Sequence, residues 1–254
     1  MGQNVQVLKG AEHFYLKGNN VGILISHGFM GTPQSVRYLG EELAKFGYSI
    51  YAPRLKGHGT DYYDLETCSH EDWFVSLEEG YQFLKGKCSK VFIVGQSMGG
   101  TLTLNLANKY RDVDGIILIN PALSIPTLEY VKGKTDIRFI DEGEPDIKAA
   151  DVHEITYEKA PVKSIQELQE LMEQTLSILA NITCPVLGIK SSVDHVVPPE
   201  NTKLIMNQIR SENAELITLL NSYHVASMDQ DKDLIVERCH QFILKQLSLK
   251  LKAM

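Results

Sequence analysis

The chain has 254 residues, of which 43% are hydrophobic and 22% are charged, which is enough for one sizeable α/β domain with a buried core. Its formal net charge of −7 argues against a nucleic-acid partner and against an anionic membrane surface, because both require basic patches. The four cysteines are scattered without a close-spaced pair, so we expect reduced thiols, no disulfide framework and no bound metal.

The first twenty residues lack the apolar core of a signal peptide. No window in the chain approaches the roughly 18 apolar residues of a membrane span. We therefore expect a cytoplasmic protein without an integral membrane segment. Antiparallel edge strands can precede Val21.

Short apolar runs then alternate with amphipathic stretches. The runs are rich in Val, Ile and Leu, as parallel strands buried on both faces are, and they cover residues 21–29, 48–55, 91–95, 115–122, 185–192 and 215–221. Helical patterns cover residues 33–46, 72–84, 101–109, 199–209 and 232–247. This alternation predicts βαβ units around a mostly parallel sheet flanked by helices.

Residues 123–181 interrupt the alternation. Their first half is polar and rich in turn residues, and their second half has the apolar spacing of an amphipathic helix. A connection of about 60 residues is too long for an ordinary loop. We therefore expect residues 123–181 to form a small inserted cap (the cap segment) over one edge of a core made of residues 1–122 and 182–254.

Ser97 stands in the pentapeptide GQSMG, between the apolar run VFIV and a helical pattern. In a chain of this length the pentapeptide arises by chance with a probability of roughly one in ten, so its context has to supply the specificity. A serine on a tight strand-to-helix turn needs small residues two positions before and after it, which Gly95 and Gly99 provide. A serine that only caps a helix needs no such glycines. The pattern favours a nucleophile.

A nucleophilic serine needs a basic histidine that is held by an acid, and on such a turn the chain order is Ser, then Asp or Glu, then His. His224 follows the last apolar run and fits the base, whereas His195 comes too early. Asp194 follows the preceding apolar run and fits the acid, although a turn residue is the common role of an Asp at such a place. Acidic residues 229, 231 and 233 are expected to be first-turn charges of the final helix.

Negative charge that develops on a substrate carbonyl needs backbone N–H donors. The residue after the nucleophile, Met98, should supply one of them. The loop after the first predicted strand of the core, most simply Phe29, should supply the other. A plain strand-to-helix turn remains the alternative for this loop.

With these residues in place, the chain resembles α/β-hydrolases, and more narrowly the bacterial monoacylglycerol lipases and thermostable carboxylesterases. The resemblance covers nearly the whole chain and is carried by SHGFMGTP, PRLKGHGT, GQSMGGTLTL, YEKAP, DHVVPPEN and NSYHVA. It implies a triad of Ser97, Asp194 and His224, a cap, and a cap glutamate that meets glycerol hydroxyls, here matched by Glu154. The segment FIDEGEPD departs from the lipase pattern, which has an apolar residue near Gly143.

The prediction is a serine hydrolase without a cofactor, which cleaves a small carboxylic ester with an apolar acyl chain through an acyl-enzyme. Phe29, Met30 and the apolar residues of the helix over 165–179 are candidates for the acyl channel. A general carboxylesterase without glycerol specificity shares every catalytic residue and stays open. A ligand-binding protein without turnover is a further alternative. Dehalogenase chemistry is disfavoured, because it requires Asp in place of Ser97.

Overall fold

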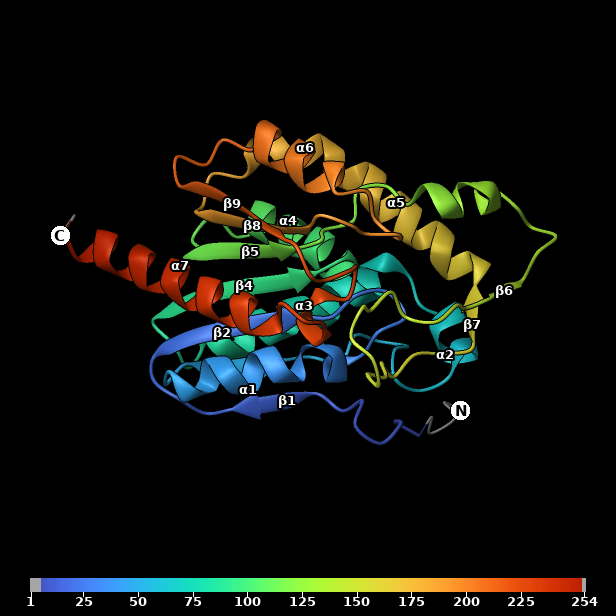
Figure 1. The fold of residues 1–254 in the computed structure, drawn as a ribbon, viewed down its shortest axis with the longest axis horizontal. Helices are drawn as coiled ribbons and strands as arrows, with labels where there is room; N and C mark the ends of the chain where they lie inside the picture. Colours follow the sequence, from blue (N-terminus) through green and yellow to red (C-terminus); the bar gives the residue numbers. More distant parts are fainter. Residues whose placement is uncertain (1–5, 253–254) are drawn as a thin grey trace.

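A seven-stranded sheet forms the centre of the computed structural model, which describes residues 6–252 (Figure 1). The strand order is β1-β3-β2-β4-β5-β8-β9. Only β1 pairs antiparallel within this sheet, at one edge, so the predicted parallel sheet and its antiparallel edge strand are confirmed. The strands are β1 (Phe14–Leu16), β2 (Val21–Ser26), β3 (Ser49–Ala52), β4 (Lys90–Gln96), β5 (Gly115–Ile119), β8 (Val186–Ser191) and β9 (Ala214–Leu219).

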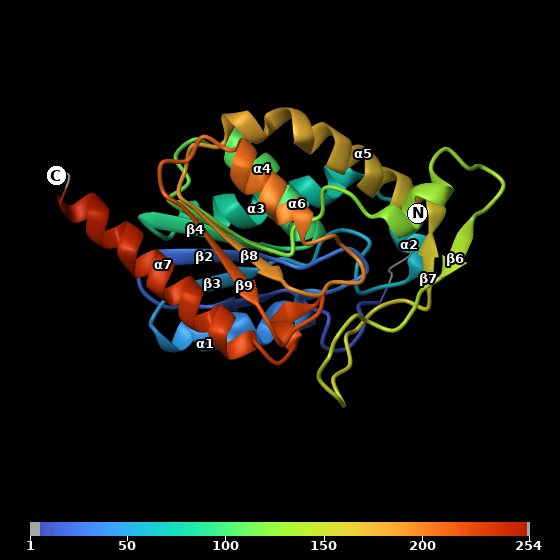
Figure 2. The same cartoon turned by 45° about the horizontal axis from the view of Figure 1, so that its top comes forward.

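Helices cover both faces of the sheet (Figure 2). One face packs against α1 (Arg37–Lys45) and α7 (Lys232–Lys252), and the other packs against α3 (His70–Lys85), α4 (Met98–Lys109) and α6 (Glu200–Gln208). Side chains along a strand alternate between these two cores: Ile23 and Ile25 belong to one and Leu24 to the other, and all three are fully buried. Burial on both faces explains why β2 reads as a continuous apolar run.

The loop before α7 corrects one prediction. Asp229 and Asp231 do not belong to the first turn of the final helix, which begins at Lys232. Both are buried, and they accept the backbone N–H groups of Tyr223 and Asn221, respectively, at 2.8 Å. The loop folds back on itself, which a one-dimensional spacing argument does not reveal. Asp233, the third acidic residue of this group, does lie in the first turn.

The cap segment lies beyond the carboxyl ends of the strands and along α4 (Figures 1 and 2). Its short strands pair antiparallel in a separate two-stranded sheet, and its long helix lies where the amphipathic pattern predicts one. The Asn105 side chain of α4 donates to the Thr175 hydroxyl of that helix at 2.7 Å. The elements are η2 (Pro126–Val131), β6 (Phe139–Asp141), β7 (Lys159–Pro161), α5 (Val162–Ile178) and η3 (Leu179–Asn181).

Two of the sequence motifs meet where the cap segment returns to the core. The Tyr157 hydroxyl of YEKAP donates to the Gly57 carbonyl and accepts from the Thr60 amide, both at 2.7 Å. These two hydrogen bonds attach the PRLKGHGT loop to the cap segment. Three further helices complete the part of the chain that the structure describes: η1 (Pro33–Val36), which forms the start of the helix predicted over 33–46, α2 (Tyr62–Glu66) and η4 (Ala226–Met228). No helix within residues 6–252 combines the length and the apolar character needed to cross a membrane.

Candidate active site

Ser97 lies on the turn between β4 and α4 with φ 55° and ψ −122°, in the left-handed half of backbone space that side chains rarely adopt. A Cβ built on Gly95 would lie 2.2 Å from the carbonyl oxygen of Gly99, and one on Gly99 would lie 2.5 Å from the carbonyl oxygen of Ser26. The turn therefore requires glycine at both positions. A helix cap would not impose this requirement, and the Ser97 side chain makes no cap hydrogen bond.

The structure brings Ser97, His224 and Asp194 together in that order. His224 Nε2 lies 2.9 Å from Ser97 Oγ, and His224 Nδ1 lies 2.8 Å from Asp194 Oδ2. The other oxygen of Asp194 accepts the amides of Val196 and Val197 at 2.9 and 2.8 Å. Because the carboxylate can only accept, the neutral imidazole carries its proton on Nδ1 and presents Nε2 as a base toward the hydroxyl.

The two predicted oxyanion donors are free to bind a ligand. Within residues 6–252, the amides of Phe29 and Met98 donate to no protein acceptor. The loop that carries Phe29 passes close to Ser97, because a Cβ on Gly28 would lie 3.2 Å from the Cβ of Ser97. Met98 is the first residue of α4, so the positive end of the helix dipole adds to this field.

A buried histidine supports the loop of Phe29. The Leu55 amide donates to His27 Nε2 at 3.2 Å, so the proton resides on Nδ1, which donates to the Gly28 carbonyl at 2.9 Å. Burial lowers the pKa of His27 to about 4. This side chain is therefore neutral at physiological pH. Its two hydrogen bonds fix the backbone immediately before the predicted oxyanion donor.

A cavity of about 290 Å³ opens at Ser97 and His224. Its apolar part is contributed by the core and the cap segment, through Phe29, Met30, Ile125, Leu128, Ile140, Ala160, Ile165 and Val196. Ile165 is the residue of α5 that lines it, whereas Leu168, Leu171 and Met172 are buried in the core. Met30 is also nearly buried, with φ 63°.

The remaining wall of the cavity is acidic. Five carboxylic side chains of the cap segment line it, namely Asp141, Glu142, Glu144, Asp146 and Glu154. Glu154 approaches the core so closely that a Cβ on Gly31 would lie 2.6 Å from its Oε1. Burial raises the pKa of Glu154 to about 7, against a smaller opposing effect of His224. The position matched to a glycerol contact thus shares the cavity with Ser97 and His224.

Asn120, a polar residue that the sequence pattern did not single out, supports the loop of His224 through hydrogen bonds. It follows β5 with φ 44°, and its Nδ2 donates to the carbonyl of His224 at 2.9 Å and to Ser191 Oγ at 3.0 Å. Its Oδ1 accepts the Ser191 amide at 2.7 Å. It links the strand before Asp194 to the loop of His224. A signal was available, since a polar residue directly after a buried parallel strand lies at the edge where sites form.

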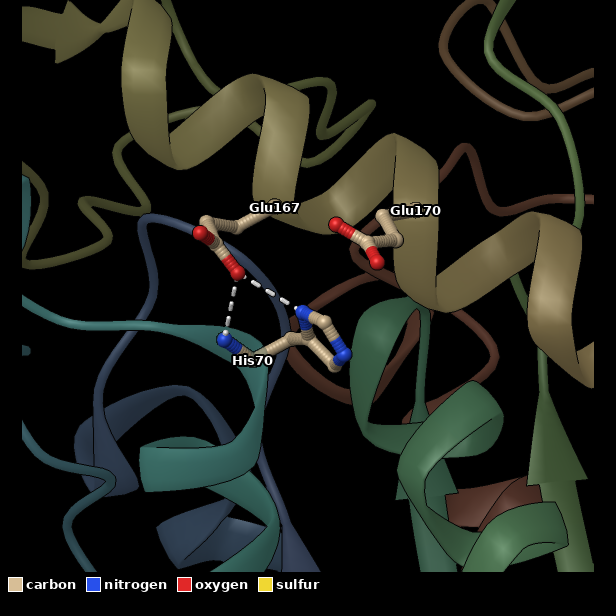
Figure 3. Close-up of side chains that lie close together, drawn as sticks. All are labelled: His70, Glu167 and Glu170. Carbon is tan, nitrogen blue, oxygen red and sulfur yellow. Dashed lines mark hydrogen bonds and ion pairs between the residues drawn. The ribbon is translucent and has the colours of Figure 1, made fainter.

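A second cluster of ionisable side chains lies between α3 and α5 (Figure 3). Ligand-capable atoms of His70, Glu167 and Glu170 lie within 4.8 Å of one another. Glu167 Oε2 accepts both the amide and Nδ1 of His70, at 3.1 and 2.7 Å, and Glu170 is exposed. Glu167 thus accepts hydrogen bonds from the first amide of α3 and from the buried imidazole of His70. These bonds connect α5 to α3, which explains the cluster as a structural contact.

Comparison with known proteins places this geometry in a family. Residues 19–231 match the family model described as serine aminopeptidase, S33. The chain is 47% identical over 247 residues to the thermostable monoacylglycerol lipase of Bacillus sp. (strain H-257). This match covers 96% of this chain and 99% of that protein. It is 26% identical over 243 residues to the carboxylesterase of Bacillus subtilis (strain 168), over 91% and 96%.

A solved structure reported for LipS and LipT, two metagenome-derived lipolytic enzymes, superposes on this chain with a TM-score of 0.92 at 41% identity. The match covers 94% of this chain and 100% of that one. The monoacylglycerol lipase of Paleococcus ferrophilus has the same fold at 16% identity, with a TM-score of 0.77. The chain therefore belongs to the serine aminopeptidase S33 family of α/β-hydrolases.

Proposed function

We propose that the chain hydrolyses carboxylic esters with an apolar acyl chain, and that monoacylglycerols are among its substrates. The main support for the proposal is that His224 Nε2 lies 2.9 Å from Ser97 Oγ, and that both residues line a partly apolar cavity. The chain is an ester hydrolase, in keeping with the names of its lipase and carboxylesterase relatives.

The proposed reaction begins when Ser97 Oγ attacks the ester carbonyl and His224 Nε2 takes its proton. Asp194 orients the imidazole and stabilises the imidazolium that forms. The amides of Phe29 and Met98 bind the oxyanion, and a preorganised donor of this kind contributes roughly 3 kcal/mol. The protonated His224 then gives its proton to the leaving alcohol, which leaves an acyl-enzyme. Water activated by His224 attacks the acyl carbonyl and releases the acid.

The two parts of the cavity correspond to the two parts of such an ester. The apolar wall, which includes Phe29 and Ile165, suits the acyl chain. Glu154 faces the same space, and its raised pKa keeps a large neutral fraction that can both donate and accept hydrogen bonds. This suits an alcohol with several hydroxyl groups, such as glycerol. Residues 123–181 are proposed to act as the cap that supplies this wall.

A carboxylesterase without glycerol specificity is the second candidate. The observation that favours it is the exposed, acidic loop around Gly143, where an apolar wall would be needed to enclose glycerol. Rates on 1-monoacylglycerols and on ethyl esters of the same acids separate the two candidates. A preference for glycerol that Glu154→Ala removes supports the lipase, and equal rates on both series support the carboxylesterase.

Fluorophosphonate labelling at neutral pH tests the nucleophile directly. The wild-type chain should be labelled on Ser97 and should hydrolyse a short acyl ester, whereas Ser97→Ala should do neither and should melt like the wild type. A ligand-binding protein without turnover would stay unlabelled, and retention of more than a few percent of activity in Ser97→Ala would refute the assignment. A cytoplasmic location stays a prediction, which cell fractionation tests.

A further inference from the structure

The carboxylate of Asp146, in the loop between β6 and β7, binds both loops that carry the proposed acid and base. The amide of His224 donates to Asp146 Oδ2 at 3.1 Å, and the amide of His195 donates to the same oxygen at 3.0 Å. Nδ1 of His195 lies 2.7 Å from Oδ1. The amide of Val225 donates to the carbonyl oxygen of Asp146 at 3.1 Å. One cap residue therefore contacts the base itself and the residue after Asp194.

Asp229 makes the reciprocal connection from the core. Its carboxylate accepts the amides of Lys148 and Ala149 in the cap segment, each at 2.9 Å, and the amide of Tyr223 at 2.8 Å. Asp229 is 1% exposed, and carboxylates that accept several N–H groups form strong, short hydrogen bonds. Residues 146–149 and the loop of His224 are thus held together from both sides.

We propose that Asp146 is a positioning residue, which sets the placement of His224 relative to Asp194 from the cap segment. The proposal rests on the proposed function, because it presumes that these two side chains serve Ser97. A misplacement of about 1 Å in a catalytic group can cost roughly a hundredfold in rate. Without the Asp146 carboxylate, the amides of His224 and His195 lose the one oxygen atom that accepts from both of them.

The hydrogen bonds from the two backbone amides to Asp146 contribute more to this positioning than the imidazole of His195 does. The His195 side chain is 57% exposed, so its contact with Asp146 is screened by water. The Asp146 side chain is only 14% exposed, and its two backbone donors have no other acceptor within the described residues. We therefore expect the hydrogen-bonding oxygen of Asp146, more than its charge, to matter.

Steady-state kinetics with a soluble short-chain ester test the proposal. Asp146→Ala should lower kcat by about 10- to 100-fold while KM stays within about threefold. Asp146→Asn keeps an oxygen for both backbone amides and should stay within about threefold of wild-type kcat. Asp136→Ala is the matched control, because Asp136 is an exposed cap aspartate that does not line the cavity. This control should retain wild-type kcat.

The proton on His224 Nδ1 gives a readout that does not depend on turnover. In wild type it should give a downfield NMR signal from its hydrogen bond to Asp194, and Asp146→Ala should broaden or abolish that signal. A folded Asp146→Ala variant with wild-type kcat and an intact signal overturns the proposal. An Asn variant as impaired as the Ala variant also overturns it, in favour of an effect of charge.

Two further outcomes are distinguishable. If the wild-type chain hydrolyses no ester but Asp146→Ala still loses the NMR signal, the proposed function fails and the positioning role stands. If Asp146→Ala does not fold, Asp146→Glu replaces it, because the added methylene keeps the charge but displaces the oxygens. Its kcat should then fall at least threefold below that of Asp146→Asn, and equal values for the two variants overturn the proposal.

Discussion

Gly95 and Gly99 face each other across the turn that holds Ser97, so closely that a Cβ on Gly95 would lie 2.2 Å from the Gly99 carbonyl oxygen. The atom in the way belongs to the backbone of α4 and cannot rotate aside. Gly95→Ala should therefore push α4 away from β4. We expect a loss of at least about 2 kcal/mol in the free energy of unfolding and little remaining esterase activity.

Gly86→Ala is the matched control for this prediction. A Cβ at Gly86, which has φ −71°, would meet its nearest neighbour at 3.6 Å, which is an ordinary contact. Its stability should change by no more than about 0.5 kcal/mol, as at most surface positions. Urea unfolding and ester hydrolysis measure both variants. A Gly95→Ala variant as stable and active as Gly86→Ala would show that the turn does not need the glycine.

Much of this arrangement could be predicted from the sequence because it depends on local pattern. Ser97 is marked by a strand before it, a helix after it and glycines that a cap would not need. Asp194 and His224 each follow a predicted strand, and carboxyl ends of parallel strands share one edge of a sheet. Chain order was enough to choose His224 over His195, and the structure brings His224, not His195, to Ser97.

The remaining contacts depend on how loops fold back, and periodicity carries no information about that. Asp229 looked like a helix-terminal charge but is a buried acceptor for both the cap segment and the loop of His224. Asp146 lies in a polar stretch without periodic signal, and its partners are 49 and 78 residues away along the chain. Asn120 differs, because its place directly after β5 was visible in the sequence.

Asp194→Asn separates an acid in a triad from a residue that only shapes a turn. Asparagine keeps an oxygen for the amides of Val196 and Val197, so the turn and the melting temperature should be preserved. Its NH2 group would face His224 Nδ1 and could not accept the proton there. We expect kcat to fall by about 10³- to 10⁴-fold, as the loss of the correct tautomer does in serine proteases. A folded variant with wild-type kcat would leave Asp194 with the turn role alone.

His27→Gln tests whether a buried neutral histidine makes the fold sensitive to acid. Burial lowers the pKa of His27 to about 4, whereas the unfolded chain takes up this proton near its ordinary value of 6.5. Between these values the unfolded state binds more protons, so stability falls as the pH drops from about 6.5 to 4. The variant should lose about 1–3 kcal/mol at pH 7, because the Leu55 amide loses a well-placed acceptor.

The pH dependence distinguishes this linkage from a simple loss of packing. Urea unfolding of wild type and His27→Gln at pH 7 and pH 5 should show a smaller decrease in the variant. His13→Gln is the control, because His13 is an exposed histidine outside the cavity. Parallel decreases in wild type and His27→Gln would contradict the assignment of acid sensitivity to His27.

Glu154→Gln should change the pH dependence of stability in the opposite direction. Burial raises the pKa of Glu154 to about 7, above its ordinary value of 4.5. Between these values the folded state binds more protons, so the stabilisation present below pH 4.5 is lost as the pH rises through 7. The variant cannot ionise and should avoid this loss, so its free energy of unfolding should gain at most about 3 kcal/mol over wild type between pH 5 and pH 8.

Glu144→Gln removes the same charge from an exposed site on the same cavity and is the matched control. Urea unfolding at both pH values measures the gain, and equal gains in the two variants would show that lower net charge, rather than burial of Glu154, is the cause.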